Sequence, residues 1–241
     1  MAERIIFLDE VDSTNTVLRA LAEDGAPDGQ VVAAKRQTAG RGRFSRAFDS
    51  QAGGLYLSYL MRGCGESCFD MTGRAAVAVR RALSRTCGVE VNIKWLNDLV
   101  LNRRKICGML AQGLFLKEKS IIILGIGLNV NQRSFPDGLE GIASSLFIET
   151  GKEYDINELA FQVVRELDIV RNEPAESVLN EYRNACITVG KEITVVSASE
   201  RRRAQAISIN GNFSLSVRYE NGEERNVSSG EVSVRGLYDY T

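Results

Sequence analysis

The segment from Ser120 to Gln132, "SIIILGIGLNVNQ", constrains the fold more than any other part of the 241-residue chain. Its residues from Ile121 to Leu128 are all apolar or glycine, without the alternation of a strand that faces water on one side. Such a strand is usually central in its sheet and covered on both faces. The apolar stretch is too short and too rich in glycine to cross a bilayer, so we expect no membrane association.

The segments around this strand predict a mixed α+β domain. Apolar residues at helical spacing predict helices over residues 13–24, 69–88 and 156–185, and Pro174 interrupts the last of them. Asp12 or Ser13 is expected to cap the first helix. Further strands are predicted over residues 4–11, 29–37, 55–61 and 89–96, followed by a hairpin over residues 98–113 that turns at residues 102–104.

The character of the chain changes near Val189. From there the pattern consists of short strands, with Asn-Gly pairs at Asn210 and Asn221. Asn-Gly between alternating strands is a strong hairpin signal. We therefore predict two domains, a mixed α+β domain over residues 1–188 and a small all-β barrel over residues 189–241.

Composition excludes several kinds of chemistry. The chain has no histidine, which removes Ser-His-Asp and Cys-His catalysis and most zinc sites. Any catalysis must use lysine, arginine, aspartate, asparagine and backbone groups. A formal net charge of −1 gives no global basic field for nucleic acid.

The N-terminus and the cysteines predict a cytoplasmic protein. The opening "MAERIIFLDEVDS" has no basic region followed by a long apolar one, so it is not a signal peptide. The five cysteines are irregularly spaced, and without export they are expected to be reduced. Cys64 and Cys68 lack the spacing of a usual zinc knuckle, which favours ordinary structural thiols.

The stretch "QTAGRGRFSRAF", Gln37 to Phe48, combines arginines with glycines. It fails the Rossmann fingerprint, because Ser45 stands where the third glycine belongs, and no part of the chain fits a Walker A loop. Arg41 and Arg43 could still grip phosphate or carboxylate oxygens, on a backbone that glycines allow to approach a ligand. The alternatives are a lid over a ligand and a solvated surface loop.

A second group of charged residues surrounds the predicted hairpin. Lys94, Asn97, Asp98 and Lys105 lie at the end of a strand and in the hairpin that follows. Two lysines with a carboxylate between them suit an anionic, metal-assisted substrate, since Asp can hold Mg²⁺ or accept a proton. The alternative is a charged sheet edge that discourages aggregation.

Two polar clusters are compatible with either a ligand or an internal role. Asn129 and Asn131 end the apolar strand, where their amides could meet a purine edge or the backbone of a neighbouring loop. Ser13, Thr14 and Asn15 could bind a polar ligand, although helix capping accounts for one hydroxyl.

Taken in order, the motifs resemble those of the biotin–protein ligases, also called biotin–[acetyl-CoA-carboxylase] ligases. The resemblance covers roughly residues 5–150 and rests on "DSTN", "QTAGRGR", "GGLYLS", "KWLND" followed by "KICGML", "GIGLNVN" and "IASSL". It implies a mixed-sheet catalytic domain of the biotin/lipoate ligase type, followed by a small SH3-like β-barrel. It also implies that biotin and Mg·ATP form biotinyl-5′-AMP, which is then transferred to a lysine of a biotin carboxyl carrier protein such as an acetyl-CoA carboxylase subunit.

The resemblance also implies roles for individual residues. The expected catalytic residues are Lys105, Arg41, Asp98 and Lys94, with Asp98 a possible Mg²⁺ ligand. The expected biotin-binding residues are Ser13, Thr14, Asn15, Gln37, Arg41, Gly42, Arg43 and Lys105. The expected ATP or adenylate contacts are Gly40, Arg43, Arg46, Phe48, Asn97, Asn129, Ser144 and Ser145.

The chain departs from the usual pattern of these ligases in four places. Phe44 and Ser45 replace an Arg-Gly pair, Phe48 stands at a tryptophan, Leu96 replaces proline, and Gln112 stands where glutamate is common. About ten residues precede "DSTN", too few for a DNA-binding module, so we expect no repressor function. The alternatives are a lipoate or octanoate ligase or transferase of the same fold, and a non-catalytic adenylate-binding protein. A monomer and a homodimer are both compatible with the sequence.

Overall fold

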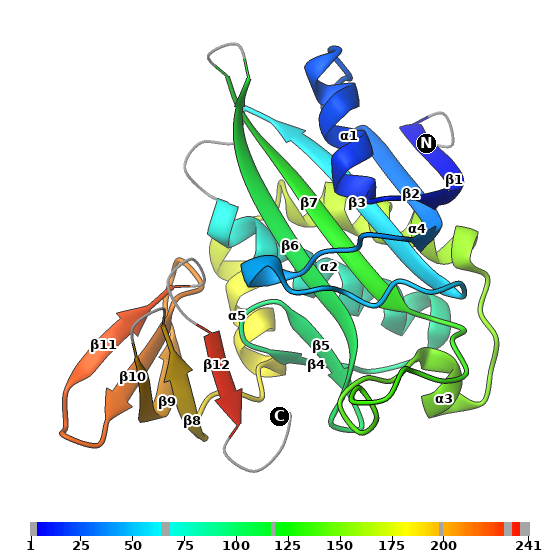
Figure 1. Ribbon diagram of the computed structural model, residues 1–241. Helices are drawn as coiled ribbons and strands as arrows, with labels where there is room; N and C mark the ends of the chain where they lie inside the picture. The colour runs from blue at the N-terminus through cyan, green and yellow to red at the C-terminus, as the bar shows by residue number, and fades with distance from the viewer. Residues whose placement is uncertain (1–3, 64–67, 117–118, 198–199, 229–232, 237–241) are drawn as a thin grey trace.

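Two β-sheets organise the chain in the computed structural model, which describes residues 4–63, 68–116, 119–197, 200–228 and 233–236 (Figure 1). The larger sheet has seven strands in the order β1-β2-β3-β7-β6-β5-β4. Strands β1 and β2 run parallel, whereas the other neighbours are antiparallel, so the sheet is mixed as predicted. Its strands are β1 (Ile5–Val11), β2 (Val31–Gln37), β3 (Gly54–Arg62), β4 (Asn92–Lys94), β5 (Asp98–Leu101), β6 (Arg104–Leu116) and β7 (Lys119–Asn129).

Strand β7 lies in the middle of the larger sheet, which confirms the prediction from its apolar sequence. Ile122, Leu124 and Ile126 point into the main core on one face. Ile121 and Ile123 point to the other face and pack in a smaller cluster that includes Leu18 of the first helix. Because side chains alternate along a strand, the next residues on that second face are Gly125, Gly127 and Asn129.

Helices cover the two faces unequally. Figure 1 shows α2, α4 and α5 behind the larger sheet and α1 in front of it. The predicted break at Pro174 is confirmed, since this residue caps the N-terminus of α5. The helices are α1 (Thr14–Glu23), α2 (Cys68–Cys87), α3 (Leu146–Thr150), α4 (Ile156–Val170) and α5 (Ala175–Ala185).

Two local predictions were wrong. The strand expected over residues 89–96 is only three residues long, because the chain turns at Trp95, where Thr188 accepts the backbone N–H at 2.9 Å. The turn of the β5–β6 hairpin consists of Asn102 and Arg103, both with positive φ, while Arg104 already belongs to β6. Two consecutive residues of positive φ are typical of a tight two-residue hairpin.

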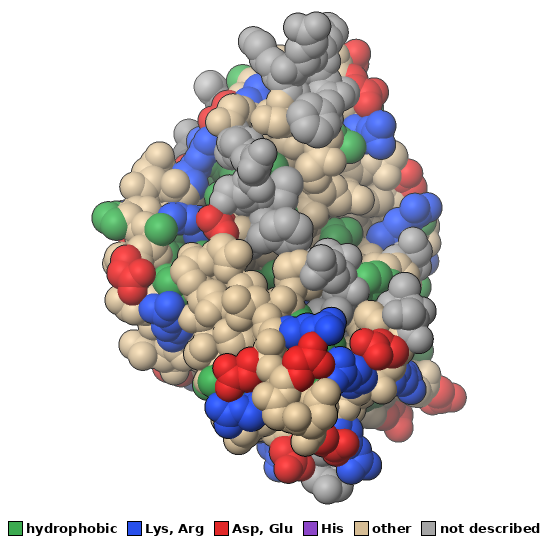
Figure 2. Space-filling view, turned by 90° about the vertical axis from the view of Figure 1, so that its left-hand side faces the viewer, with side chains coloured by type: hydrophobic (Ala, Val, Ile, Leu, Met, Phe, Trp, Pro, Cys, Tyr) green, Lys and Arg blue, Asp and Glu red, His purple; other side chains and the backbone are tan. Residues whose placement is uncertain are grey.

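The second sheet has five antiparallel strands in the order β11-β10-β9-β8-β12, consistent with the expected SH3-like barrel. Its outer strands carry ion pairs such as Arg218–Glu224 and Arg225–Glu223, and Figure 2 shows acidic and basic side chains interspersed on this side of the molecule. The strands are β8 (Glu192–Val196), β9 (Arg201–Ile209), β10 (Leu215–Tyr219), β11 (Glu224–Val227) and β12 (Ser233–Gly236).

The two Asn-Gly pairs behave differently. Gly222 has a φ of 83° and closes a tight connection between β10 and β11, as predicted. Asn210 and Gly211 instead belong to a longer loop, in which the positive φ falls on Phe213. The side chain of Asn210 binds Ser214 at 3.0 Å, which stabilises this wider loop.

Phe213 joins the two sheets. Its ring lies against α2 at Gly73, where a Cβ atom would be only 2.2 Å from the ring, and packs edge-on against Tyr182 at 5.1 Å. Its carbonyl accepts the indole N–H of Trp95 at 2.8 Å. One continuous core therefore runs across the sequence boundary expected at residue 188, and the division into residues 1–188 and 189–241 stays a prediction.

Replacing Phe213 by alanine is expected to lower the free energy of unfolding by about 3–5 kcal/mol, since the ring is buried and its removal leaves a cavity. Urea denaturation followed by far-UV circular dichroism measures this loss. Phe213→Leu, which keeps much of the volume, should lose clearly less. An alanine variant as stable as the wild type would contradict the assigned packing.

The cysteines whose side chains the structure describes are not paired in disulfides. Cys87, Cys107 and Cys186 are free thiols, and burial raises the pKa of Cys87 to about 11 and also raises that of Cys107. Cys64 and the side chain of Cys68 lie outside the described residues, so the expectation for that pair stays a prediction. None of the described helices is long and apolar enough to span a membrane.

Candidate active site

A cavity of about 480 Å³ lies on the same face of the larger sheet as α1, next to the N-terminal end of that helix. Its floor includes Gly108 of β6 and Gly125 and Gly127 of β7. A Cβ atom at Gly125 would lie 2.6 Å from the Asn15 side chain, and one at Gly127 would lie 2.5 Å from the ring of Phe48. The missing side chains of β7 therefore leave room for Asn15 and Phe48, which line the cavity.

Hydroxyl and amide groups line one end of the cavity and bind one another. Gln37 accepts hydrogen bonds from the backbone N–H of Thr14 at 2.8 Å and from its hydroxyl at 3.1 Å. The hydroxyl of Ser58 lies 2.7 Å from that of Thr14. The Asn15 amide donates to the side-chain oxygen of Gln112 at 2.8 Å. A glutamate at position 112 could accept the same hydrogen bond.

Ser13 does not have the capping role that the sequence allowed. It stands at the N-cap position of α1, yet its side chain makes no capping hydrogen bond. Ser13 also lines the cavity. Its hydroxyl can therefore face a ligand.

Residues 38–49, here called the flap, fold as a hairpin over the cavity. The backbone pairs Gln37 with Ser50 and Gly40 with Phe48, through hydrogen bonds of 3.0 Å and 2.9 Å. The amide of Gln37 donates to the Ser50 hydroxyl at 3.0 Å, which fixes the base of the flap to the polar end of the cavity. Gly40 has no space for a side chain, since a Cβ atom would lie 2.3 Å from the Ser50 hydroxyl.

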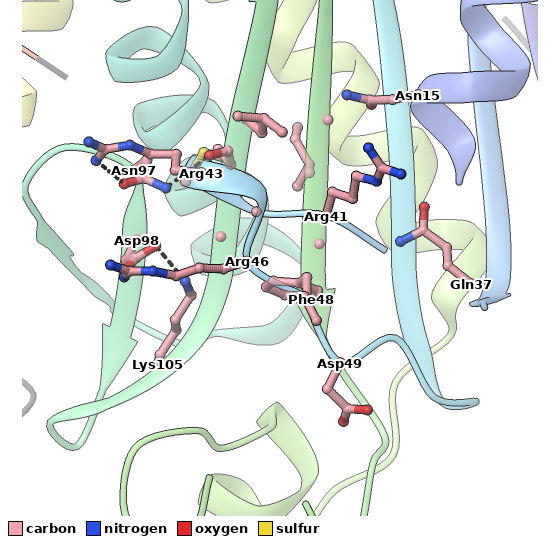
Figure 3. Close-up of a pocket in the computed structure, with 18 of the residues that line it drawn as sticks. Asn15, Gln37, Arg41, Arg43, Arg46, Phe48, Asp49, Asn97, Asp98 and Lys105 are labelled. Carbon is pink, nitrogen blue, oxygen red and sulfur yellow. Dashed lines mark hydrogen bonds and ion pairs between the residues drawn. The ribbon is translucent and has the colours of Figure 1, made fainter. Parts of the chain in front are cut away.

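Cationic groups line the other end of the cavity. Figure 3 shows Arg43, Arg46, Asp98 and Lys105 on one side of the site and Asn15 and Gln37 on the other. The ammonium of Lys105 lies 2.7 Å from the Asp98 carboxylate and 5.6 Å from the centre of the Phe48 ring. These contacts place most of the charged side chains at one end of the cavity, whereas Arg41 points toward the hydroxyl and amide groups of the other end (Figure 3).

Arg43 is the most desolvated cation of the flap. Its guanidinium donates to the side-chain oxygen Oδ1 of Asn97 at 3.2 Å, while the side-chain amide of Asn97 donates to the backbone carbonyl of Met109 at 2.9 Å. Burial lowers the pKa of Arg43, the Asp98 carboxylate opposes this shift, and Arg46 adds to it. A buried cation near other cations is stabilised by an anionic ligand.

The hairpin that carries Asp98 and Lys105 is anchored to α3. Glu149, whose side chain is almost buried, forms an ion pair with Arg104 at 2.6 Å and accepts a hydrogen bond from Asn102 at 2.7 Å. The backbone of Lys105 also pairs with the loop before α3, through Ile142 and Ser144 at 2.8 Å each. Lys105 is therefore held on both sides by fixed backbone.

Two expected ligand contacts, Asn129 and Ser145, have other partners. The amide of Asn129, which lines the cavity, donates to the carbonyl of Ser144 at 2.9 Å, so the loop-backbone alternative is the one observed. The hydroxyl of Ser145 accepts from the N–H of Ile148 at 3.1 Å and caps α3. Ser144, Ser145 and Gly40 do not line the cavity.

The other expected site residues lie together around the cavity. They come from the start of α1, from β2, the flap, the β4–β6 segment and the end of β7, which are far apart in sequence. The group consists of Ser13, Thr14, Asn15, Gln37, Arg41, Gly42, Arg43, Arg46, Phe48, Lys94, Asn97, Asp98, Lys105 and Asn129.

Sequence reasoning missed part of the lining. The glycines of the floor could have been found, because Gly125 and Gly127 recur with the period of a strand after Ile121 and Ile123. Phe135, Leu139 and Ile142, from the loop before α3, carry no local signal that places them at a site.

The fold and the cavity define a two-sheet α+β protein with a cationic ligand site beneath an arginine-containing flap. The family model of the biotin/lipoate A/B protein ligase family matches residues 7–129. The chain belongs to this family, which confirms the resemblance seen in its motifs.

Individual relatives agree with this assignment. A biotin–[acetyl-CoA-carboxylase] ligase of Mycobacterium tuberculosis is 30% identical over 77% of this chain and 72% of its own length. A bifunctional ligase/repressor BirA of Bacillus spizizenii is 39% identical over 64% of this chain, which spans about half (50%) of that relative. The structure of a biotin protein ligase from Aquifex aeolicus in complex with biotin and ATP superimposes with a TM-score of 0.85, at 28% identity, over 97% of this chain and 99% of that one.

Proposed function

We propose that this protein joins biotin to a lysine of a biotin carboxyl carrier protein, with biotinyl-5′-AMP as the intermediate. The observation that supports it best is the two-ended cavity. One end, rich in hydroxyls and amides, suits the ureido ring of biotin, and the other, which holds Lys105 and Arg43, suits a carboxylate and phosphates. The family membership and the Aquifex relative that binds biotin and ATP add support.

In the first step a biotin carboxylate oxygen attacks the α-phosphorus of ATP, and the bond to the bridging oxygen breaks to release pyrophosphate. Two anions must approach each other, so fixed cations lower the barrier. We assign to Lys105 and Arg43, which contact Asp98 and Asn97, the role of binding the carboxylate and the α-phosphate. Arg41, Arg46 and Lys94 line the same cavity and add positive charge.

In the second step the amine of the carrier lysine attacks the biotinyl carbonyl carbon. The bond from that carbon to the phosphate oxygen breaks, AMP leaves, and the amine loses a proton. Asp98 is the acidic residue paired with Lys105, and we assign to it the role of orienting the amine or accepting its proton.

Mg²⁺ is expected to enter with ATP. The described residues include no group of three or more carboxylates or thiols that could hold a metal ion. The ion would therefore bind mainly through the phosphates, as Mg²⁺ does in many nucleotide sites, with Asp98 as the candidate protein ligand.

Biotin is expected to stabilise the protein and lipoate is not. At a biotin concentration of about 100 times its Kd, binding contributes about 2.7 kcal/mol, which raises Tm by several degrees for a chain of this size. Differential scanning fluorimetry with biotin, lipoate and octanoate measures this difference.

Catalysis is tested separately. Purified protein with biotin and Mg·ATP should support biotin-dependent pyrophosphate exchange, and a carrier domain should gain the mass of one biotinyl group. Stabilisation by biotin without exchange would indicate a non-catalytic binding protein, and exchange driven by lipoate would indicate the related lipoate activity.

A further inference from the structure

Phe44 has an unusual conformation at the tip of the flap. Its φ and ψ are 56° and 38°, in the left-handed region that large side chains rarely adopt. The side chain lines the cavity, yet Phe44 is 53% exposed, so core packing does not explain its conformation. Backbone strain of this kind at a ligand cavity suggests a role for the residue that bears it.

The ring of Phe44 lies close to two arginines of the flap. The guanidinium carbon of Arg43 is 5.0 Å from the ring centre, and that of Arg46 is 6.0 Å away. The turn is closed by hydrogen bonds from Gly42 to Arg46 at 2.8 Å and from Arg46 to Arg43 at 3.3 Å. This geometry keeps two cations close together in the cavity, and the electron-rich ring face attracts both.

We infer that Phe44 is a positioning residue, whose ring holds Arg43 and Arg46 over the cavity so that the flap retains an anionic acyl-adenylate. The inference rests on the proposed function for the identity of that anion. Phe44 itself takes no part in bond making or breaking.

Three substitutions at Phe44 distinguish the effect of the aromatic ring from the effects of side-chain size and of backbone conformation. Phe44→Tyr keeps an aromatic face, Phe44→Leu keeps an apolar side chain, and Phe44→Gly relieves the backbone conformation. We expect release of biotinyl-5′-AMP, measured by chasing preformed complex, to accelerate about fivefold in the Leu and Gly variants and to be unchanged in Tyr. Biotin affinity should change less than twofold in all three, because Thr14 and Gln37 are untouched.

Stability gives an independent readout. The Gly variant should have a Tm equal to or above that of the wild type, although it releases the intermediate faster, because glycine adopts positive φ without strain. A residue with only a structural role would show loss of stability and loss of retention together. Unchanged release in the Leu variant, or release from Tyr as fast as from Gly, would overturn the inference.

A ligand-free measurement separates this inference from the proposed function. Trypsin must draw the side chain of Arg46 out of its site to cleave after it. Cleavage after Arg46 in the free protein should be faster in Phe44→Leu than in Phe44→Tyr or the wild type. If the wild type forms no adenylate, the proposed function is wrong. If trypsin cleaves all of these proteins after Arg46 at the same rate, the positioning role of Phe44 is wrong, whatever the adenylate assay shows.

Discussion

Replacing Lys105 by alanine is expected to slow biotin-dependent pyrophosphate exchange by about 10²–10³-fold. Lys105 is the cation whose backbone is fixed on both sides, by the β5–β6 hairpin and by the loop before α3. Its ammonium lies at the end of the cavity where the carboxylate and the α-phosphate would meet. Quenched-flow measurement of adenylate formation detects this loss directly, apart from carrier transfer.

The same substitution affects stability, which must be separated from catalysis. Asp98 is largely buried, with 16% of its side chain exposed, and loses the ammonium at 2.7 Å. Leaving such a group less well satisfied is expected to cost about 1–3 kcal/mol. The double variant Lys105→Ala/Asp98→Asn also removes the carboxylate charge, so it should regain stability and stay inactive.

A surface lysine provides the matched control. Lys191→Ala removes an exposed ammonium outside the cavity and should leave exchange unchanged. If Lys105→Ala formed adenylate at more than a tenth of the wild-type rate while remaining folded, the assigned role of Lys105 would be wrong.

The sequence predicted the structure best where the pattern within a single strand, hairpin or helix was enough to determine it. The apolar run from Ile121 to Leu128 identified the central strand, because its lack of alternation leaves few other positions in a sheet. The hairpin that brings Lys105 to Asp98 was also predictable, because the two residues are seven positions apart. Pro174 marked the boundary between two helices for an equally local reason.

The site depended on contacts that no local pattern contains. Arg43 binds Asn97, 54 positions away, and Asn15 binds Gln112, 97 positions away. Thr14 and Gln37 were expected to bind a ligand directly, yet much of their hydrogen-bonding capacity satisfies each other. The polar end of the cavity is therefore a preformed network, which leaves fewer groups for the ligand than the sequence suggested.

The glycines of β7 show how one residue type can be misinterpreted. "GIG" at residues 125–127 looks like part of a nucleotide-binding loop and fails that test at Val130. In the structure both glycines lie within a regular strand, paired with β3 and β6. Their role is to leave space, because Asn15 and Phe48 occupy the positions where side chains would begin.

Replacing Gly127 by valine is therefore expected to weaken biotin binding by more than about 100-fold while the protein stays folded. Valine suits a strand, and Gly127 has no positive φ, so the backbone tolerates the change. The new side chain would occupy the floor of the cavity and displace the Phe48 ring, which itself lies near Lys105. Isothermal titration calorimetry measures the loss of biotin affinity.

The adjacent residue supplies the opposite control, because neighbouring side chains of a strand point to opposite faces. Ile126 is 2% exposed and belongs to the main core. Ile126→Val should lower the free energy of unfolding by about 0.5–1.5 kcal/mol and leave biotin affinity unchanged. If Gly127→Val bound biotin like the wild type, or if Ile126→Val lost binding without losing stability, the cavity would not lie on the face assigned to it. The pair thus tests both the alternation of β7 and the position of the ligand with two one-residue changes.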